Sequence, residues 1–482
     1  MLSSDVFFKL LLFFVLFSAV CARRSRWSTV FFMLIERFHL GSFDVGFPNR
    51  RSNYTIRQRT QPMGRVYAKG RNNNGQQHRR SLSLSYPYNA PVFPVKSYRL
   101  SFSWPRLFPR GTVDEINAEG ILFYDELINA LIRNGIEPMV TLYHWDLPVT
   151  LAHKGGWLNR ETVEHYRRYA DFCFRHFGDR VKKWITINEP YIELNQGYCS
   201  RVQVFAPGFL QDHCYWTYFL GSYHLLLAHG KASRLYKSTY QPHQHGMIGI
   251  SLFVAWYEPE HPHNGIEQMG AELLIASGFD LFMQPIFGPN GDFPQVIKNR
   301  VGSRLPNLTE KEKRMLSGSA DFLGVNYYYT MLARELKTKR DNITQIEEEW
   351  GVEEIMKPSK TSQETYHPDE FQDVFRYIKK QYGNVTMFIT ENGCQDAEGE
   401  GLNDKSRIKY LRGHMKEVAK AIMNGSDIRG YFVWSLMDNF EWSFGYEQKF
   451  GLFSVDFTNT TRPRTPKKSS KWFAKVTRTN RI

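Results

Sequence analysis

The sequence has few cysteines, a single long apolar run, and little net charge outside one segment. Only 5 of its 482 residues are cysteine, too few for a disulfide-rich scaffold. Their spacings fit no zinc site, so we expect no metal. The apolar run from Leu10 to Val20 is too short to span a bilayer comfortably. With 42% hydrophobic and 15% aromatic residues, the chain can form a large globular core.

The N-terminus has the pattern of a secretory signal over residues 1–22. Lys9 precedes the apolar run, and Val20-Cys21-Ala22 places a small residue at the cleavage position. We therefore expect no transmembrane segment in the mature chain, and a location in the secretory pathway, the lysosome or outside the cell. N-glycosylation sequons fit that route, although we expect Asn384, just before a predicted strand, to be poorly accessible. The sequons lie at Asn53, Asn307, Asn342, Asn384, Asn424 and Asn459.

Four cysteines remain once Cys21 leaves with the signal. Cys199 and Cys214 are 15 residues apart around a loop that contains Gly and aromatic residues. A disulfide between them and two free thiols are equally open. Cys173 lies on the apolar face of a predicted helix and is expected in the core.

The formal charge of +14 is concentrated in residues 23–96, which hold 14 Lys and Arg but only two acids. The rest of the mature chain has 47 basic and 45 acidic residues. A distributed phosphate-binding face is therefore not supported, and we expect no nucleic-acid partner. A heparin- or nucleic-acid-binding role for residues 23–96 is the weaker alternative, because scattered arginines with few aromatics are typical of a solvated, partly disordered stretch.

From about residue 97 to 482, apolar strand-like runs alternate with amphipathic helical patterns. Near-continuous apolar runs are typical of parallel strands buried on both faces, and their alternation with helices predicts an α/β fold, a (β/α)8 TIM barrel. One helix places Ile121, Tyr124, Leu127, Ile128 and Leu131 on one face and ends near Gly135. The predicted strands are Ser97–Trp104, Pro138–Trp145, Lys183–Glu189, Met247–Trp256, Asp321–Tyr328, Val385–Glu391 and Arg429–Leu436.

The eighth strand of such a barrel should be its first, within residues 23–96. Trp27 to Ile35 could form it, but Arg-, Asn- and Gln-rich sequence without helical periodicity follows. The first strand–helix unit is therefore expected to be divergent or missing. A mis-predicted or alternatively spliced exon, a genuine divergent replacement and a tail on a damaged barrel would each explain this. We favour the mis-predicted or alternatively spliced exon, because residues 23–96 form one contiguous aberrant block and the rest of the sequence fits. An open barrel would leave two strand edges unpaired.

Polar residues follow several predicted strands. Asn188-Glu189-Pro190 and Glu391-Asn392-Gly393 end two of them, and His144-Trp145-Asp146 and Asn326-Tyr327-Tyr328 end two others. In a parallel barrel these ends meet at one rim, where active sites are built. Two carboxylates among tryptophans there indicate a glycosidase, since acids can transfer protons and attack while aromatic faces stack on sugars. A single glutamate would more often be a salt-bridge partner or a helix cap.

From Tyr98 to the C-terminus the chain resembles glycoside hydrolase family 1, the β-glucosidase, lactase and klotho group. The resemblance covers about four-fifths of the chain and runs in family order. The matching motifs are YRLSFSWPRLFPRG (98–111), LYHWDLP (142–148), GGWLN (155–159), FGDRVKKWITINEP (177–190), SGSADFLGVNYY (317–328), FITENG (388–393) and GYFVWSLMDNFEWSFGY (430–446).

The resemblance implies a retaining β-glycosidase without cofactor, with Glu189 as acid/base and Glu391 as nucleophile, their carboxyls about 5.5 Å apart. It implies that three residues orient the nucleophile, with nearby positive charge holding it ionised; these are Arg99, Tyr328 and Asn326. It also implies a sugar-binding set, in which Asn188 binds the 2-hydroxyl and Trp434 stacks on the ring. That set is His144, Trp145, Asn188, Trp434, Glu441 and Trp442.

The implied substrates are unphosphorylated β-glucosides, β-galactosides or glycolipid-type β-glycosides, because Glu441 would repel a 6-phosphate. The family glutamine that binds the sugar 3- and 4-hydroxyls from the first strand cannot be found in residues 23–96. A klotho-like barrel that binds a glycan or protein hormone without turnover is therefore the alternative function, and it would have a protein partner.

Overall fold

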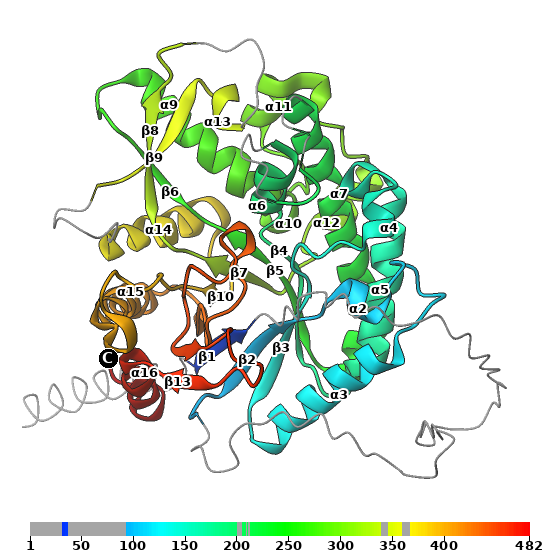
Figure 1. Cartoon of the computed structure of the whole chain (residues 1–482). Coiled ribbons are helices and arrows are strands. Elements are labelled where there is room, and N and C mark those ends of the chain that lie inside the picture. The colour runs from blue at the N-terminus through cyan, green and yellow to red at the C-terminus, as the bar shows by residue number, and fades with distance from the viewer. Residues whose placement is uncertain are drawn as a thin grey trace, which may run out of the picture. The chain divides into compact units, whose positions relative to one another are not determined.

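The structure is a computed structural model that describes residues 31–36 (backbone only), 93–199, 205–208, 210, 213–338, 346–358 and 367–482. Within it, eight strands form a closed parallel barrel in the order β1-β11-β10-β7-β5-β4-β3-β2 (Figure 1). The barrel predicted from the alternating pattern is confirmed. Its strands are β1 (Phe31–Glu36), β2 (Ser97–Ser101), β3 (Glu137–Tyr143), β4 (Lys183–Asn188), β5 (Met247–Phe253), β7 (Phe322–Asn326), β10 (Met387–Glu391) and β11 (Ile428–Val433).

The first strand–helix unit was expected to be divergent or missing, and its strand is present in the barrel. β1 overlaps the Trp27–Ile35 candidate and ends one residue beyond it, at Glu36. It pairs parallel with β11 from Phe31↔Gly430 and with β2 from Met33↔Ser97. The barrel therefore has no open edge. Residues 37–92, in which no helix could be recognised from the sequence, lie outside the described residues.

Helices surround the barrel, with α3, α5 and α7 on one side and α14, α15 and α16 on another (Figure 1). Their bounds are α2 (Trp104–Leu107), α3 (Ala118–Arg133), α4 (Val149–Ala152), α5 (Glu161–Phe177), α6 (Pro190–Leu194), α7 (Cys214–Leu235), α8 (Gln241–Gln244), α9 (Gly265–Ile275), α10 (Leu281–Phe287), α11 (Gln295–Val301), α12 (Glu310–Leu316), α13 (Ile346–Glu349), α14 (Phe371–Tyr382), α15 (Lys405–Met423) and α16 (Lys468–Thr479). Short 3₁₀ or π turns extend or connect several of them.

The helix α3 shows why these segments are helical. The Asn117 side chain caps its start by accepting the Glu119 N–H at 3.2 Å. Its apolar stripe buries Tyr124, Leu127, Ile128 and Leu131, as predicted, whereas Ile121 is only half-buried. Gly135 adopts a positive φ of 70° just beyond the helix end.

The barrel interior is filled mainly by large side chains from its strands, so it is a packed core rather than a channel. Met139, Ile185, Phe322, Phe388 and Phe432 form this cluster, all at most 2% exposed. Cys173 is also fully buried, in agreement with its predicted core position.

Two small sheets lie outside the barrel. Predicted strand Met247–Trp256 is in fact two elements, because β5 ends at Phe253 and β6 (Trp256–Pro259) pairs instead with β8 (Thr330–Glu335). β8 also pairs with β9 (Val352–Met356), and β12 (Phe453–Val455) pairs with β13 (Arg464–Pro466). Among the described residues, no helix has the length and apolar character needed to cross a membrane.

Candidate active site

Two buried glutamates stand at the carboxyl ends of barrel strands. Glu391 is the last residue of β10, and Glu189 follows β4 directly and precedes α6. They are 3% and 5% exposed. Glu189 has a left-handed backbone with φ 43°, which costs a non-glycine residue about 1–3 kcal/mol and often marks functional positions. Both predicted carboxylates therefore lie at the barrel rim.

Each oxygen of Glu391 has a strong donor. Arg99 on β2 donates from Nη1 to Oε1 at 2.7 Å, and the hydroxyl of Tyr328 donates to Oε2 at 2.6 Å. Arg99 is 1% exposed, so this is a buried, charge-assisted hydrogen bond. The two contacts fix the carboxylate plane and leave it no freedom to rotate.

A line of hydrogen bonds connects the two glutamates. Arg99 donates from Nη2 to Asn188 Oδ1 at 2.6 Å, and the Asn326 amide donates to the same oxygen at 3.1 Å. The Asn326 amide also donates to Glu189 Oε1 at 2.6 Å. The expectation for Asn326 needs correction here, since this side chain contacts the predicted acid/base and not the predicted nucleophile.

The environment of Glu189 favours its protonated form. Burial raises the pKa of Glu189 well above its usual value, and the nearby negative charge of Glu391 raises that pKa further. The hydrogen bond from Asn326 and the charge of Arg99 act in the opposite direction. A carboxyl that holds a proton near a second, doubly hydrogen-bonded carboxylate is the arrangement that general acid catalysis requires.

Three small hydroxyl side chains that the sequence prediction missed complete this network. Thr141 accepts a hydrogen bond from Arg99 Nε at 3.1 Å. Thr390 donates to Asn326 Oδ1 at 2.6 Å, which sets the amide orientation, and Ser251 donates to Thr390 at 3.1 Å. Thr390 directly precedes Glu391 within the TENG motif, so its position there was the available signal.

Aromatic rings lie close together beside the carboxylates. His144 contacts Trp434 and Trp442, with both centroid distances 6.0 Å, and Trp145 packs on Trp442 at 4.4 Å. His144 Nε2 also lies 3.2 Å from Asn188 Nδ2. These residues bring the predicted sugar-binding set together, with partly stacked faces that suit the C–H side of a sugar.

Glu441 completes the set. Its negative charge is close enough to contribute to the raised pKa of both Glu189 and Tyr328. The backbone reaches this position through a tight turn, in which Glu441 N–H donates to the Gly445 carbonyl at 2.6 Å. Glu441 and Trp442 thus lie on a loop that follows β11.

Buried ion pairs hold that loop in place. Asp438 accepts the Gly451 N–H at 2.9 Å and pairs with Lys467 at 3.0 Å. Arg407 donates to the Phe450 carbonyl at 3.0 Å. Arg407, Lys467 and Asp438 were not identified from the sequence, where they read as ordinary surface charges.

A disulfide joins Cys199 to Cys214, with the two Cα atoms 4.5 Å apart. The loop that it closes contains Phe205, whose ring lies 5.5 Å from Trp145 and 5.4 Å from Trp442. The disulfide therefore restrains a segment that touches the aromatic wall of the site.

Among the described residues, the group with metal-ligand spacing is Glu260, His261 and Glu267. Its members come from the region of β6 and α9 and already have partners. Arg334 binds Glu260, and Glu267 accepts the backbone N–H groups of His261 and Glu335. We assign no metal to it, and none is needed for the carboxylate chemistry described above.

Comparison with known sequences gives a consistent result. A family model described as glycosyl hydrolase family 1 matches residues 91–482. Human cytosolic β-glucosidase is 40% identical over 396 residues, covering 80% of this chain and 83% of that protein. Arabidopsis thaliana β-glucosidase 42 is 40% identical over 398 residues, covering 79% of each.

Solved structures agree with the sequence relatives. Aphid myrosinase superposes with a TM-score of 0.73 at 34% identity, covering 81% of this chain and 85% of that one. A rice β-glucosidase mutant in covalent complex with glucose has the same TM-score of 0.73 at 36% identity, covering 79% and 84%.

Proposed function

The chain belongs to glycosyl hydrolase family 1, and on that premise we propose that Glu391 is the nucleophile and Glu189 the acid/base of its retaining β-glycosidase reaction. The observation that carries the proposal is the asymmetry between the two carboxyls. Glu391 accepts from Arg99 and Tyr328 on both oxygens, whereas burial and Glu391 raise the pKa of Glu189.

In the first step the Glu391 carboxylate attacks the anomeric carbon while the bond to the aglycone oxygen breaks. The Glu189 carboxyl gives its proton to that oxygen, so the leaving group departs neutral. Arg99 and Tyr328 hold Glu391 in line for attack. The covalent complex with glucose in the rice relative is consistent with such an intermediate.

In the second step the ionised Glu189 takes a proton from water, and the resulting hydroxide attacks the same carbon and releases Glu391. The charge of Glu391 changes between these steps, which lets the pKa of Glu189 fall when the intermediate forms and rise again when it is hydrolysed. Asn326 contacts Glu189 throughout and positions it for both roles.

The sugar site suits a neutral, unphosphorylated glycoside. His144, Trp434 and Trp442 provide ring faces for it. Asn188, which accepts a hydrogen bond from Arg99, binds the 2-hydroxyl in this proposal. The charge of Glu441 would repel a 6-phosphate. The non-catalytic, klotho-like alternative was based on the missing glutamine motif of the first strand. β1 closes the barrel but contains no glutamine, and the enzyme is favoured because the relatives are named β-glucosidases.

The stereochemistry of the product tests this mechanism. We expect proton NMR of the purified protein acting on an aryl β-glucoside to show the β-anomer of the free sugar first, before mutarotation. Retention follows because two displacements each invert the anomeric carbon. An α-anomer formed first, or no turnover of either aryl β-glucoside or aryl β-galactoside, would contradict the assignment.

We also propose that the chain enters the secretory pathway and is glycosylated. The described sequon residues Asn307, Asn384, Asn424 and Asn459 are all exposed, which corrects the expectation of a poorly accessible Asn384. Asn53 and Asn342, like the signal at residues 1–22, lie outside the described residues. The Cys199–Cys214 disulfide suits an oxidising compartment.

Mobility on a denaturing gel tests this route. Treatment of protein from a eukaryotic secretory host with peptide-N-glycosidase should increase its mobility, and Thr309→Ala, which removes the Asn307 sequon, should remove one step of that shift. An unchanged mobility, with the protein retained inside the cell, would contradict the proposal.

A further inference from the structure

A groove of about 760 Å³ lies between the helices α15 and α16, which pack against each other on the outside of the barrel (Figure 1). Among the described residues, nine line it, of which six are basic and none is acidic. They are Lys405, Ile408, Lys409, Arg412, Gly413, Lys416, Lys468, Lys471 and Trp472.

Four of the cations form a single stripe on α15. Lys405, Lys409, Arg412 and Lys416 are spaced by four, three and four residues, which places them on one face of a helix. At 1.5 Å per residue the stripe is roughly 16 Å long. Lys468 and Lys471 on α16 face it from the other side of the groove, so positive charge lines both walls.

Five of these cations have no carboxylate partner in the described part of the chain: Lys405, Arg412, Lys416, Lys468 and Lys471 are all exposed and make no ion pair there. Like charges at this spacing repel one another along the helix. Because the barrel body is close to neutral, with 47 basic and 45 acidic residues outside residues 1–96, the groove is a local excess and not part of a general surface charge.

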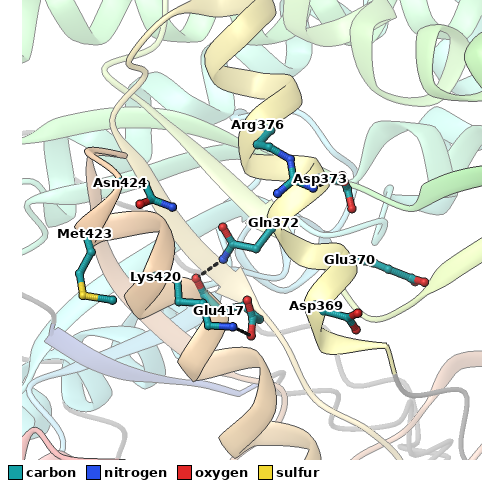
Figure 2. Close-up of a pocket in the computed structure, with 9 residues that line it drawn as sticks. All are labelled: Asp369, Glu370, Gln372, Asp373, Arg376, Glu417, Lys420, Met423 and Asn424. Carbon is teal, nitrogen blue, oxygen red and sulfur yellow. Dashed lines mark hydrogen bonds and ion pairs between the residues drawn. The ribbon is translucent and has the colours of Figure 1, made fainter.

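A second pocket, on the other side of α15, is lined by more acidic than basic residues. It lies between α14 and α15, measures about 590 Å³ and is lined by four acids and two bases (Figure 2). Each of its two cations pairs with one of its own acids, Arg376 with Asp373 and Lys420 with Glu417. The cations of this second pocket are thus neutralised by its own acids, unlike the five unpaired cations of the groove between α15 and α16.

The groove also has an aromatic surface. Trp472 is half-buried in its wall, and the Arg412 guanidinium lies 5.7 Å from the centre of the Trp472 ring. A half-exposed ring beside cations offers a sugar face a stacking surface and its anionic groups a charged partner.

We propose that this groove binds one chain of a sulfated or carboxylated polysaccharide. Two packed helices have axes about 8–10 Å apart, so their groove admits one extended chain but neither a flat bilayer nor a double helix. Single-stranded nucleic acid is bound mainly by successive stacked aromatics, and Trp472 is the one aromatic among the described residues that line the groove. The repeated charges of the α15 stripe require a ligand with repeated anionic groups.

The proposal is tested with full-length protein and a heparin decasaccharide, by titration calorimetry at several salt concentrations. The variant Arg412→Gln/Lys416→Gln/Lys471→Gln should raise Kd about tenfold or more at 0.1 M salt. It should also lower the slope of log Kd against log salt by about two, because each lost charge contact removes roughly 0.7–0.9. A desulfated decasaccharide should bind weakly to both proteins.

The matched control removes the same charge elsewhere. Arg133→Gln/Lys154→Gln/Lys311→Gln changes three exposed cations outside the groove, and it should change Kd less than twofold. This control separates the groove from the basic segment 23–96, which all variants retain. Equal weakening by both triple variants would overturn the proposal, as would tighter binding of single-stranded DNA or phosphatidylserine vesicles than of the decasaccharide.

Hydrolysis of an aryl β-glucoside should be unchanged in both triple variants, since none of the substituted residues contacts the carboxylate network. A chain that binds the decasaccharide but does not hydrolyse glycosides would contradict the proposed catalytic roles without affecting this inference.

Discussion

Replacing Glu391 by Gln or Ala is expected to reduce kcat for aryl β-glucosides by roughly four to six orders of magnitude, the scale on which loss of a covalent nucleophile acts in other hydrolases. Arg99 and Tyr328 would still point at the position of the carboxylate, but no carboxylate oxygen would remain to attack the anomeric carbon. Azide should partly restore Glu391→Ala and yield the α-glycosyl azide, because a small anion can occupy the space beside those two donors. Initial rates with and without azide, and NMR of the product, measure both effects.

A matched control for Glu391 is Glu312. It is a buried, ion-paired glutamate on α12 that contacts Arg160 and caps its own helix, so Glu312→Gln should change kcat less than a few-fold. With the parent protein, a 2-fluoro glucoside should label a single peptide that contains Glu391. A label on another residue, or more than a tenth of the parent activity in Glu391→Gln, would rule out the assigned role.

Most of the barrel was predictable because its strands are continuous apolar runs that end in polar motifs. Seven strands and both glutamates followed from that pattern. The first strand could be offered only as a candidate, Trp27–Ile35, because the sequence after it has no recognisable helical periodicity. Only its pairing with both β11 and β2 identifies it as a barrel strand.

The partner of Asn326 could not be predicted for a different reason. β7 lies between β5 and β10, so its end faces the ends of several strands. Glu391 is in register with Asn326 only after a shift between Ile389 and Glu391, and sequence does not reveal such a shift. The amide consequently reaches Glu189, and Thr390 takes the place beside it.

The buried charged residues that hold the sugar-binding loop could not be predicted for a third reason. Lys467 lies in a basic stretch near the C-terminus, and Arg407 and Asp438 are far from it in sequence. A charged residue is usually solvated, so its spacing gives no indication of burial. In the structure Lys467 and Arg407 are each 1% exposed. Lys467 binds Asp438, and Arg407 donates to the Phe450 carbonyl.

The second large effect concerns Glu189→Gln. We expect kcat for glycosides with poor leaving groups to fall by about 10²–10⁴-fold, the usual contribution of a general acid. Activated aryl glycosides should be less affected in the first step, since their leaving group needs no proton. The alkaline limb of the parent pH profile, which reflects loss of the Glu189 proton, should disappear, and azide should give the β-glycosyl azide. A pH profile with the same alkaline limb in the variant would exclude Glu189 as the acid.

The same substitution should stabilise the fold, with a pH dependence of definite sign. An unfolded glutamate loses its proton near about pH 4.3, whereas burial and Glu391 keep the pKa of Glu189 higher in the folded chain. Between these two pKa values the folded chain binds more protons than the unfolded one, so the free energy of unfolding of the parent falls as pH rises. Glutamine has no proton to lose and still accepts from Asn326, so Glu189→Gln avoids this cost.

The expected gain at neutral pH is about 1.4 kcal/mol for each pH unit between the unfolded pKa and the lower of the folded pKa and pH 7. It should vanish below about pH 4, where both states of the parent are protonated. Denaturant unfolding at pH 7 and pH 4 measures it. Glu193→Gln is the control: burial raises the pKa of Glu193 to about 8, so its pH dependence should have the same sign, yet its contacts are with Tyr143 and Trp157 and not with the catalytic pair. Activity should therefore fall far less in that variant.

Two outcomes would contradict this prediction: equal loss of activity in Glu189→Gln and Glu193→Gln, or a Glu189→Gln protein that is less stable than the parent at pH 7. Either would mean that the raised pKa of Glu189 reflects burial without a catalytic role.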